Sequence, residues 1–275
     1  MHTPRRSLAV LALGAALMGA SACSFQIGEI DKAGSTSRPG TTATGAPQGA
    51  GTPGTPGTAG VDSTGEPTPV AGSTGGPAPA GQIDETEFGE DITAAPQVVD
   101  EYWRTHWSEF FTGTYTSPRV HGGYNGNDLS TAPTCAGQPA TKFNAFYCIP
   151  EDYIAWDDNL MRAGYAQGDA WVYLVIAHEW GHAIQNRLRM EHVAQASELQ
   201  ADCLAGATLY GAKRDGTLTF EEGDVKELSN GLVAIGDDAE WTDPEDHGDP
   251  IQRITAFGKG RDGGVGACIP EAQTS

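Results

Sequence analysis

The chain has 275 residues and a formal net charge of −20, and this charge is unevenly distributed. Basic and acidic residues cancel in residues 1–82, so the negative charge lies entirely on residues 83–275. Such an acidic domain would repel nucleic acid and anionic lipid, so we expect no nucleic-acid partner. A solubilising surface is the favoured interpretation of the charge, over an acidic recognition surface. Residues 83–275 are long enough for one domain with its own core.

Residues 1–22 are typical of a secretory signal peptide. After two arginines, residues 8–18 are apolar, and the small residues Ala20, Ser21 and Ala22 follow. The apolar run is short for a membrane span, and small residues suit cleavage. Cys23 then resembles the lipid-modified cysteine of a bacterial lipoprotein. We expect an extracytoplasmic protein, lipid-anchored to the bacterial cell membrane through Cys23, with plain secretion as the alternative.

Residues 23–82 read as a linker rich in glycine, proline and threonine. The stretch GTPGTPGTAG at 51–60 is the clearest example, and large apolar residues are almost absent between residues 28 and 82. Such a composition buries too little surface to offset the entropy lost on ordering. We therefore expect a disordered tether followed by a folded domain over residues 83–275.

Four further cysteines are expected to form disulfides, because the protein is predicted to be exported. They are Cys135, Cys148, Cys203 and Cys268. Three pairings are possible. Cys135–Cys148 would close a local loop, and Cys203–Cys268 would tie a helix to the C-terminal tail. Zinc coordination by these cysteines is disfavoured because no C-x-x-C pair is present.

The first half of the domain mixes helix, loop and strand. Apolar residues recur at helical spacing over 97–111, which predicts a core-facing helix in which His106 is structural. The turn formers of HGGYNGND, from His121, predict a loop. FNAFYC and YIAW, between residues 143 and 156, predict a β-hairpin that turns at Pro150-Glu151-Asp152.

The second half is predicted to be helical. Helical patterns cover 169–190, 193–213 and 221–235, and a fourth begins at Pro250, a residue that helix starts accept, and runs to 259. The fold class expected is therefore α+β, mostly helical with a small sheet.

The first of these helices contains IAHEWGHAIQ, in which His178, Glu179 and His182 spell H-E-x-x-H. Residues four apart lie on one face of a helix, so both histidines can bind one metal ion. Glu179 would lie beside the open position of that ion, where it can accept a proton from water and later deliver it to a leaving amine. The residues before the motif are nearly all apolar, as expected for a buried helix.

The next helix supplies a third ligand in SELQADC. Glu198 and Asp202 are four residues apart, so they share a face, and the residues around them look buried. Glu198 would complete a His₂Glu zinc site with an open fourth position. Asp202 would hold the other ring nitrogen of a ligand histidine. A solvated acidic pair is the alternative, but it does not explain the apolar neighbours.

These motifs together resemble the neutral zinc metallopeptidase family of bacterial membranes and envelopes. HEWGHAIQ and ELQADCLAG carry the resemblance, and AFYCIPEDYIAWD, EEGDVKELSNGLVAIGDD and HGDPIQRITAF extend it over about residues 98–259. The resemblance implies a zincin-like fold and peptidase activity. It implies His178, His182 and Glu198 as ligands of Zn²⁺ and Glu179 as the catalytic residue.

Two residues near the C-terminus are further candidates. His247, in a turn before a helix, could donate a hydrogen bond to the oxyanion of peptide hydrolysis, although a capping or surface role would also explain it. Arg253, on the following helix, could pair with an acidic group near the site. Acidic residues between 237 and 249 could bind calcium, but no EF-hand pattern is present.

We therefore predict a membrane-anchored zinc metallopeptidase that acts on a protein or peptide substrate. The residues from 143 to 147 could pair with that substrate as an added strand, although core packing would also explain them. Two alternatives stay open. One is a non-catalytic scaffold or adaptor that binds zinc and an envelope partner. The other is a zinc amidase that acts on cell-wall peptides.

Overall fold

The structure is a computed structural model of the chain, and it describes residues 72–73, 83–237 and 246–270. The predicted signal peptide, Cys23 and nearly all of the linker lie outside these residues. So do most of the acidic residues considered for calcium. None of the helices within the described residues is both long and apolar enough to cross a membrane.

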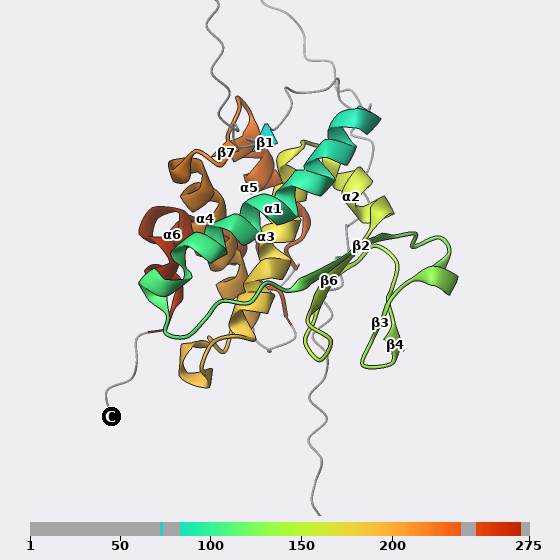
Figure 1. The fold of residues 1–275 in the computed structure, drawn as a ribbon. Coiled ribbons are helices and arrows are strands. Elements are labelled where there is room, and N and C mark those ends of the chain that lie inside the picture. The colour runs from blue at the N-terminus through green and yellow to red at the C-terminus, as the bar shows by residue number, and fades with distance from the viewer. Residues whose placement is uncertain (1–71, 74–82, 238–245, 271–275) are drawn as a thin grey trace, which may run out of the picture.

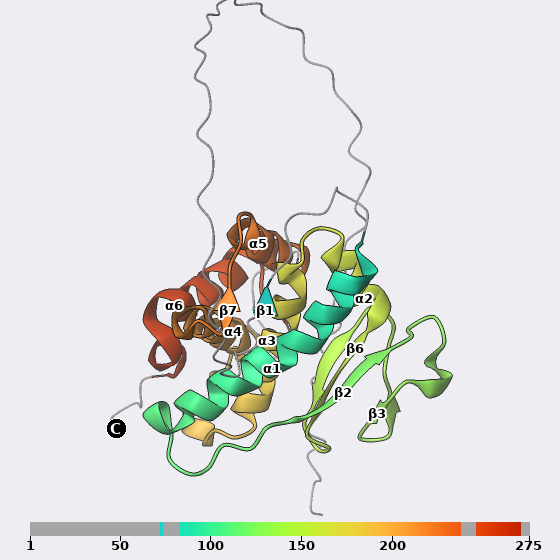
Figure 2. The same ribbon diagram turned by 45° about the horizontal axis from the view of Figure 1, so that its top comes forward.

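The domain is α+β, with the helices grouped together and a small sheet beside them (Figures 1 and 2). The helices are α1 (Glu85–Phe110), α2 (Asp158–Tyr165), α3 (Ala170–Gln185), α4 (Ser197–Asp215), α5 (Asp224–Ala234) and α6 (Pro250–Cys268). The strands are β1 (Gly72–Ser73), β2 (Arg119–Tyr124), β3 (Thr134–Cys135), β4 (Gln138–Pro139), β5 (Ala145–Cys148), β6 (Tyr153–Asp157) and β7 (Leu218–Thr219). Two short 3₁₀ turns are η1 (Leu129–Thr131) and η2 (Met190–His192).

The main sheet has three strands in the order β2-β6-β5. The predicted hairpin is confirmed, because β5 and β6 pair antiparallel with Phe146 opposite Ala155. The loop predicted from His121 is wrong at its start, because β2 includes His121 and pairs in parallel with β6. The register shifts between Val120 and Gly122, and Gly122 has a φ of 92°. Glycine accepts this conformation easily, so residues that resemble a turn form an irregular strand.

The first helix begins earlier than predicted. Its N-cap is Asp84, whose Oδ1 accepts hydrogen bonds from the backbone N–H groups of Thr86 (2.8 Å) and Glu87 (3.2 Å). Pro96, which precedes the predicted start, lies inside the helix and is buried. The short helix α2 was not predicted, and it begins at the side-chain cap of Asp157. A local side-chain cap therefore sets the start of both α1 and α2.

Helix α3 lies at the centre of the domain. Every residue from Ala170 to Gln185 is buried except the partly exposed His182. The helix packs against α1, α4 and β5. It ends at Gln185 instead of the predicted Met190, and the Gln185 side chain donates a hydrogen bond to the backbone oxygen of Ser197 at 2.6 Å. The end of α3 is thereby tied to the start of α4.

Helices α4 and α6 pack backbone to backbone. A Cβ atom built on Gly206 would lie 2.1 Å from the Phe257 oxygen, and one on Gly260 would lie 1.8 Å from the Cys203 oxygen. Only glycine permits this approach. Helix α6 starts at Pro250 as predicted but continues beyond residue 259, with non-helical backbone at Gly264.

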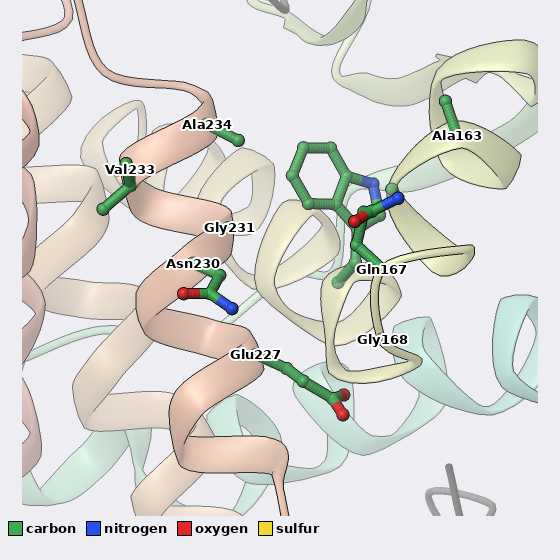
Figure 3. A pocket seen from close by; sticks show the side chains of 10 residues that line it. Ala163, Gln167, Gly168, Glu227, Asn230, Gly231, Val233 and Ala234 are labelled. Carbon is green, nitrogen blue, oxygen red and sulfur yellow. The ribbon is translucent and has the colours of Figure 1, made fainter. Parts of the chain in front are cut away.

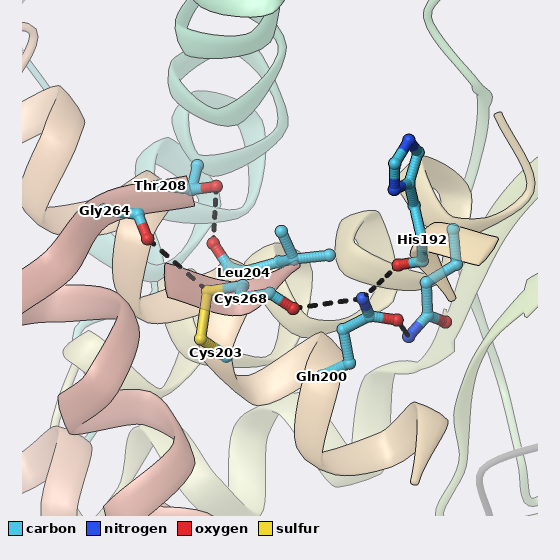
Figure 4. The surroundings of a disulfide bond; sticks show 8 residues. His192, Gln200, Cys203, Leu204, Thr208, Gly264 and Cys268 are labelled. Atoms are coloured by element: carbon cyan, nitrogen blue, oxygen red, sulfur yellow. Dashed lines mark hydrogen bonds between the residues drawn. A yellow bond between two sulfur atoms is a disulfide. The ribbon is translucent and has the colours of Figure 1, made fainter. Parts of the chain in front are cut away.

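Two disulfides form, and both were among the pairings considered. Cys135–Cys148 closes the loop before the hairpin, and Cys203–Cys268 joins α4 to the end of α6. Figure 4 shows the second disulfide beside Gln200, whose amide donates hydrogen bonds to the backbone oxygens of His192 and Cys268. The α4–α6 pair is therefore held by glycine contacts, a disulfide and buried hydrogen bonds.

Candidate metal centre

Two helices bring three ligand side chains together. His178 and His182 lie one turn apart on α3, and Glu198 lies in the first turn of α4. One potential ligand atom from each residue lies within 4.8 Å of the others. The helices approach closely at Gly181, where a Cβ atom would lie 2.9 Å from the Cα atom of Ala201. A side chain there would separate the histidines from the carboxylate.

The histidine rings are turned so that their Nε2 atoms face Glu198. Nε2 of His178 lies 3.2 Å from one carboxylate oxygen of Glu198, and Nε2 of His182 lies 3.3 Å from the other. On the opposite side, Nδ1 of His178 lies 2.8 Å from Oδ1 of Asp202, and Nδ1 of His182 lies 2.9 Å from Oε1 of Gln185. An acceptor at Nδ1 keeps the hydrogen there, so the lone pair that can bind a metal ion lies on Nε2.

Gln185 was not identified from the sequence. Its position three residues after His182 on the same helix face is the signal that could have found it. Its amide nitrogen also contacts Gln200 at 3.1 Å, so the side chain that orients His182 is itself fixed.

Asp202 is fully buried and paired with Arg253. The guanidinium Nε atom donates to Oδ2 of Asp202, and Nη2 donates to Oδ1, each at 2.8 Å. Arg253 therefore lies against an acidic group of the site, as one sequence interpretation expected. A fork of two hydrogen bonds fixes the plane of the carboxylate that contacts His178.

Glu179 follows the ligand His178 in the chain and is fully buried, and no side chain among the described residues donates a hydrogen bond to its carboxylate; only the backbone of Tyr147 acts on it as a hydrogen-bond donor. Burial raises its pKa, although His178 and His182 act to lower it. A buried carboxylate without a side-chain partner is costly, so this group needs an explanation in function. A proton-accepting role beside a metal ion provides one.

The charges around the ligands favour a bound cation. Burial acts to raise the pKa of Glu198, but His182 and His178 outweigh it and hold that pKa well below its ordinary value. Burial acts to lower the pKa of His178, but Asp202 outweighs it and raises the pKa to about 9. Two imidazole nitrogens and a carboxylate form the donor set of catalytic Zn²⁺ sites, so the residues fit zinc.

His247 lies in the turn before α6. Its backbone N–H donates to Oδ2 of Asp237 at 2.7 Å, and its Nδ1 atom lies 3.6 Å from Oδ1 of the same residue. Burial lowers the pKa of His247, and the charges of Glu198 and His178 also act on it. It therefore lies within electrostatic range of the ligands, and its side chain is partly exposed.

Carboxylates gather at a second place, beside a pocket of about 280 Å³ between α2 and α5. They are Asp169, Asp224 and Glu227. Glu227 and Asn230 line the pocket from α5, opposite Gln167 and Gly168 (Figure 3). Burial raises the pKa of Asp169 to about 8, helped by the charge of Glu227. The pocket contains none of the zinc-ligand candidates, and an all-oxygen set lacks the imidazole that zinc sites use.

The α+β fold and the H-E-x-x-H helix joined to a downstream glutamate define a zincin-like metal-dependent protein. The chain belongs to the family described as "Putative neutral zinc metallopeptidase", which it matches over residues 71–268. The cofactor of this family is Zn²⁺, and His178, His182 and Glu198 are the group placed to hold it.

Curated relatives include proteins of Escherichia coli and Mycobacterium tuberculosis. The chain is 30% identical over 230 residues to "Uncharacterized protein YpfJ" of Escherichia coli K12. The aligned region covers 73% of this chain and 76% of the relative. The chain is also 30% identical over 201 residues to "Uncharacterized protein Rv2575" of Mycobacterium tuberculosis H37Rv, which covers 60% of this chain and 64% of the relative. No solved structure gives a significant match.

Proposed function

We propose that the protein is a zinc-dependent peptidase that hydrolyses peptide bonds with Glu179 as general base. The observation that carries this proposal is the carboxylate of Glu179, which is fully buried without a side-chain partner among the described residues, next to the His₂Glu set. A scaffold that used zinc only structurally would have no need to bury a further carboxylate beside the ligands.

Zn²⁺, when bound, supplies a Lewis acid that lowers the pKa of water and polarises the scissile carbonyl. The carboxylate of Glu179 accepts a proton from the attacking water and later delivers it to the leaving amine. His247 donates a hydrogen bond to the developing oxyanion from the turn before α6.

The substrate is proposed to bind as an extended peptide along β5. This strand is at an edge of the three-stranded sheet and packs against α3, and because all four of its residues are buried, a peptide would pair with it only once that edge is uncovered. Backbone N–H and C=O groups on an edge can pair with an added strand, which would align a peptide without strong demands on its side chains.

The protein is proposed to act outside the cytoplasm from a lipid anchor at Cys23. The support is the signal-like sequence of residues 1–22 and the tether composition that follows. A Cys23→Ser variant is expected to move from the membrane fraction to the soluble extracytoplasmic fraction. Unchanged membrane association of that variant would contradict the anchor.

The activity is tested with purified wild type, Glu179→Gln and a control, Glu222→Gln, which changes an exposed glutamate away from the site. Zinc content is measured by elemental analysis, and cleavage of a peptide library is measured by mass spectrometry. We expect one zinc per chain in all three proteins and a loss of at least about 10²-fold in cleavage rate for Glu179→Gln alone.

Other outcomes separate the alternatives. A wild type that binds no zinc would refute the site. A wild type that binds zinc but leaves every peptide intact would favour the scaffold, and cleavage restricted to cell-wall peptides would favour the amidase.

A further inference from the structure

Arg253 is an unusual residue to find in a core. Its side chain is completely buried, as is that of Asp202. Burying a guanidinium is costly unless its charge and its donors are matched. Packing would be served as well by an apolar residue of similar size, so the arginine calls for a specific reason.

The guanidinium first fixes a zinc ligand through Asp202. Nε and Nη2 of Arg253 each donate to a different oxygen of Asp202 at 2.8 Å, and Oδ1 of Asp202 lies 2.8 Å from Nδ1 of His178. The arginine therefore sets the plane of the carboxylate, and the carboxylate sets the ring of His178. A two-pronged pair fixes an angle that a single hydrogen bond would leave free.

The remaining nitrogen reaches a second element of the site. Nη1 of Arg253 donates to the backbone oxygen of Ile235 at 2.7 Å, just after the end of α5. Two residues later, the backbone N–H of Asp237 donates to the Gly248 oxygen at 2.9 Å, and Oδ2 of Asp237 accepts from the N–H of His247 at 2.7 Å. The segment that holds the His247 turn is thus attached to the same guanidinium.

We propose that Arg253 is a positioning residue of the zinc centre, which orients His178 through Asp202 and anchors the turn of His247 through Ile235. Arg253 lies on the Nδ1 side of the His178 ring, where its Nη2 atom is 3.4 Å from Nδ1, so a direct contact supplements the path through Asp202. The inference rests on the zinc site of the proposed function, and it is tested by metal binding rather than by peptide cleavage.

The test measures the affinity of Zn²⁺ by competition with a chromogenic chelator, and the visible absorption of bound Co²⁺ as a report of ligand geometry. The variants are Arg253→Met, Arg253→Lys, Asp202→Asn and the double variant Asp202→Asn with Arg253→Met. The control is Arg261→Met, which changes a partly exposed arginine on the same helix. Circular dichroism checks that each protein is folded.

Arg253→Met is expected to bind Zn²⁺ at least about 10-fold more weakly than the wild type and to have an altered Co²⁺ spectrum. A loss of this size is typical when a residue that supports a ligand histidine is replaced. Arg253→Lys restores the charge but not the fork, so it should recover only part of the affinity. Arg261→Met should match the wild type. Arg253→Met should weaken Zn²⁺ binding less in the Asp202→Asn background than in the wild type, because both substitutions break the path through Asp202.

A folded Arg253→Met protein with wild-type Zn²⁺ affinity and Co²⁺ spectrum would overturn the proposal. So would an equal loss of Zn²⁺ affinity on Arg253→Met in the wild type and in the Asp202→Asn variant. If Arg253→Met does not fold, Arg253→Lys decides, and wild-type affinity in that variant overturns the proposal. A wild type that binds no zinc refutes the proposed function itself. Zinc binding that depends on Arg253 in a protein that cleaves nothing refutes only the peptidase activity.

Discussion

Replacing Gly260 by alanine tests whether the close contact of α4 and α6 holds the metal centre in place. A Cβ atom at Gly260 would lie 1.8 Å from the backbone oxygen of Cys203 and 2.8 Å from the backbone nitrogen of Ala207. Ordinary contact begins near 3.4 Å, so the helices would need to separate by about 1.6 Å. The obstacle is backbone, which cannot rotate away as a side chain can.

The expected cost is large because the pair is also clamped by the Cys203–Cys268 disulfide. Overpacking typically costs 1–3 kcal/mol, and we expect about 3 kcal/mol here. For a domain of this size, that corresponds to a fall in Tm of about 6–12 °C. The separation would also draw Arg253 away from Asp202, so zinc affinity should fall together with stability.

The matched control is Gly258→Ala on the same helix, where a Cβ atom would meet nothing within 4 Å. Alanine is favoured over glycine in a helix, so this variant should be more stable by about 0.5–1 kcal/mol. Thermal unfolding is followed by circular dichroism in the presence of a chelator, which removes the contribution of bound metal. A Gly260→Ala protein as stable as Gly258→Ala would refute the reasoning from helix contact.

Two further predictions concern a ligand and a histidine outside the site. Glu198→Gln should weaken Zn²⁺ binding by more than about 10²-fold in calorimetry, because a neutral amide replaces the anionic ligand, and unchanged affinity would remove Glu198 from the ligand set. Burial acts to lower the pKa of His106, but its hydrogen bonds to Asp215 (2.8 Å) and Glu109 (2.9 Å) outweigh burial and raise the pKa. Because the pKa of His106 is higher in the folded state, the protonated histidine stabilises the fold at pH values below its unfolded-state pKa, which is near 6.5. That stabilisation is lost as the pH rises through the folded-state pKa. His106→Gln should therefore lower the unfolding free energy by about 0.5 kcal/mol near pH 5.5 and by less near pH 9 in urea titrations, and a pH-independent effect would contradict this.

Much of the fold and of the metal centre was predictable because it depends on spacing along one element. His178 and His182 share a face of α3 whatever surrounds the helix, and the same holds for Glu198 and Asp202 on α4. The hairpin of β5 and β6 likewise follows from two apolar strands joined by a short turn.

Local signals were insufficient where a distant segment decides the outcome. The strand β2 has the composition of a loop, and it becomes a strand because β6 offers a parallel partner. The early start of α1 was missed because Pro96 marks a conventional break, whereas the cap at Asp84 and burial of the helix outweigh it.

The sequence alone therefore specified which side chains can bind a metal ion, since helical periodicity places them on common faces. Only the tertiary structure decided how those side chains are held. The turning of both Nε2 atoms toward Glu198 and the fork of Arg253 on Asp202 both require contacts between side chains placed by packing. Such contacts arise from the approach of α3, α4 and α6, which no spacing within one helix encodes.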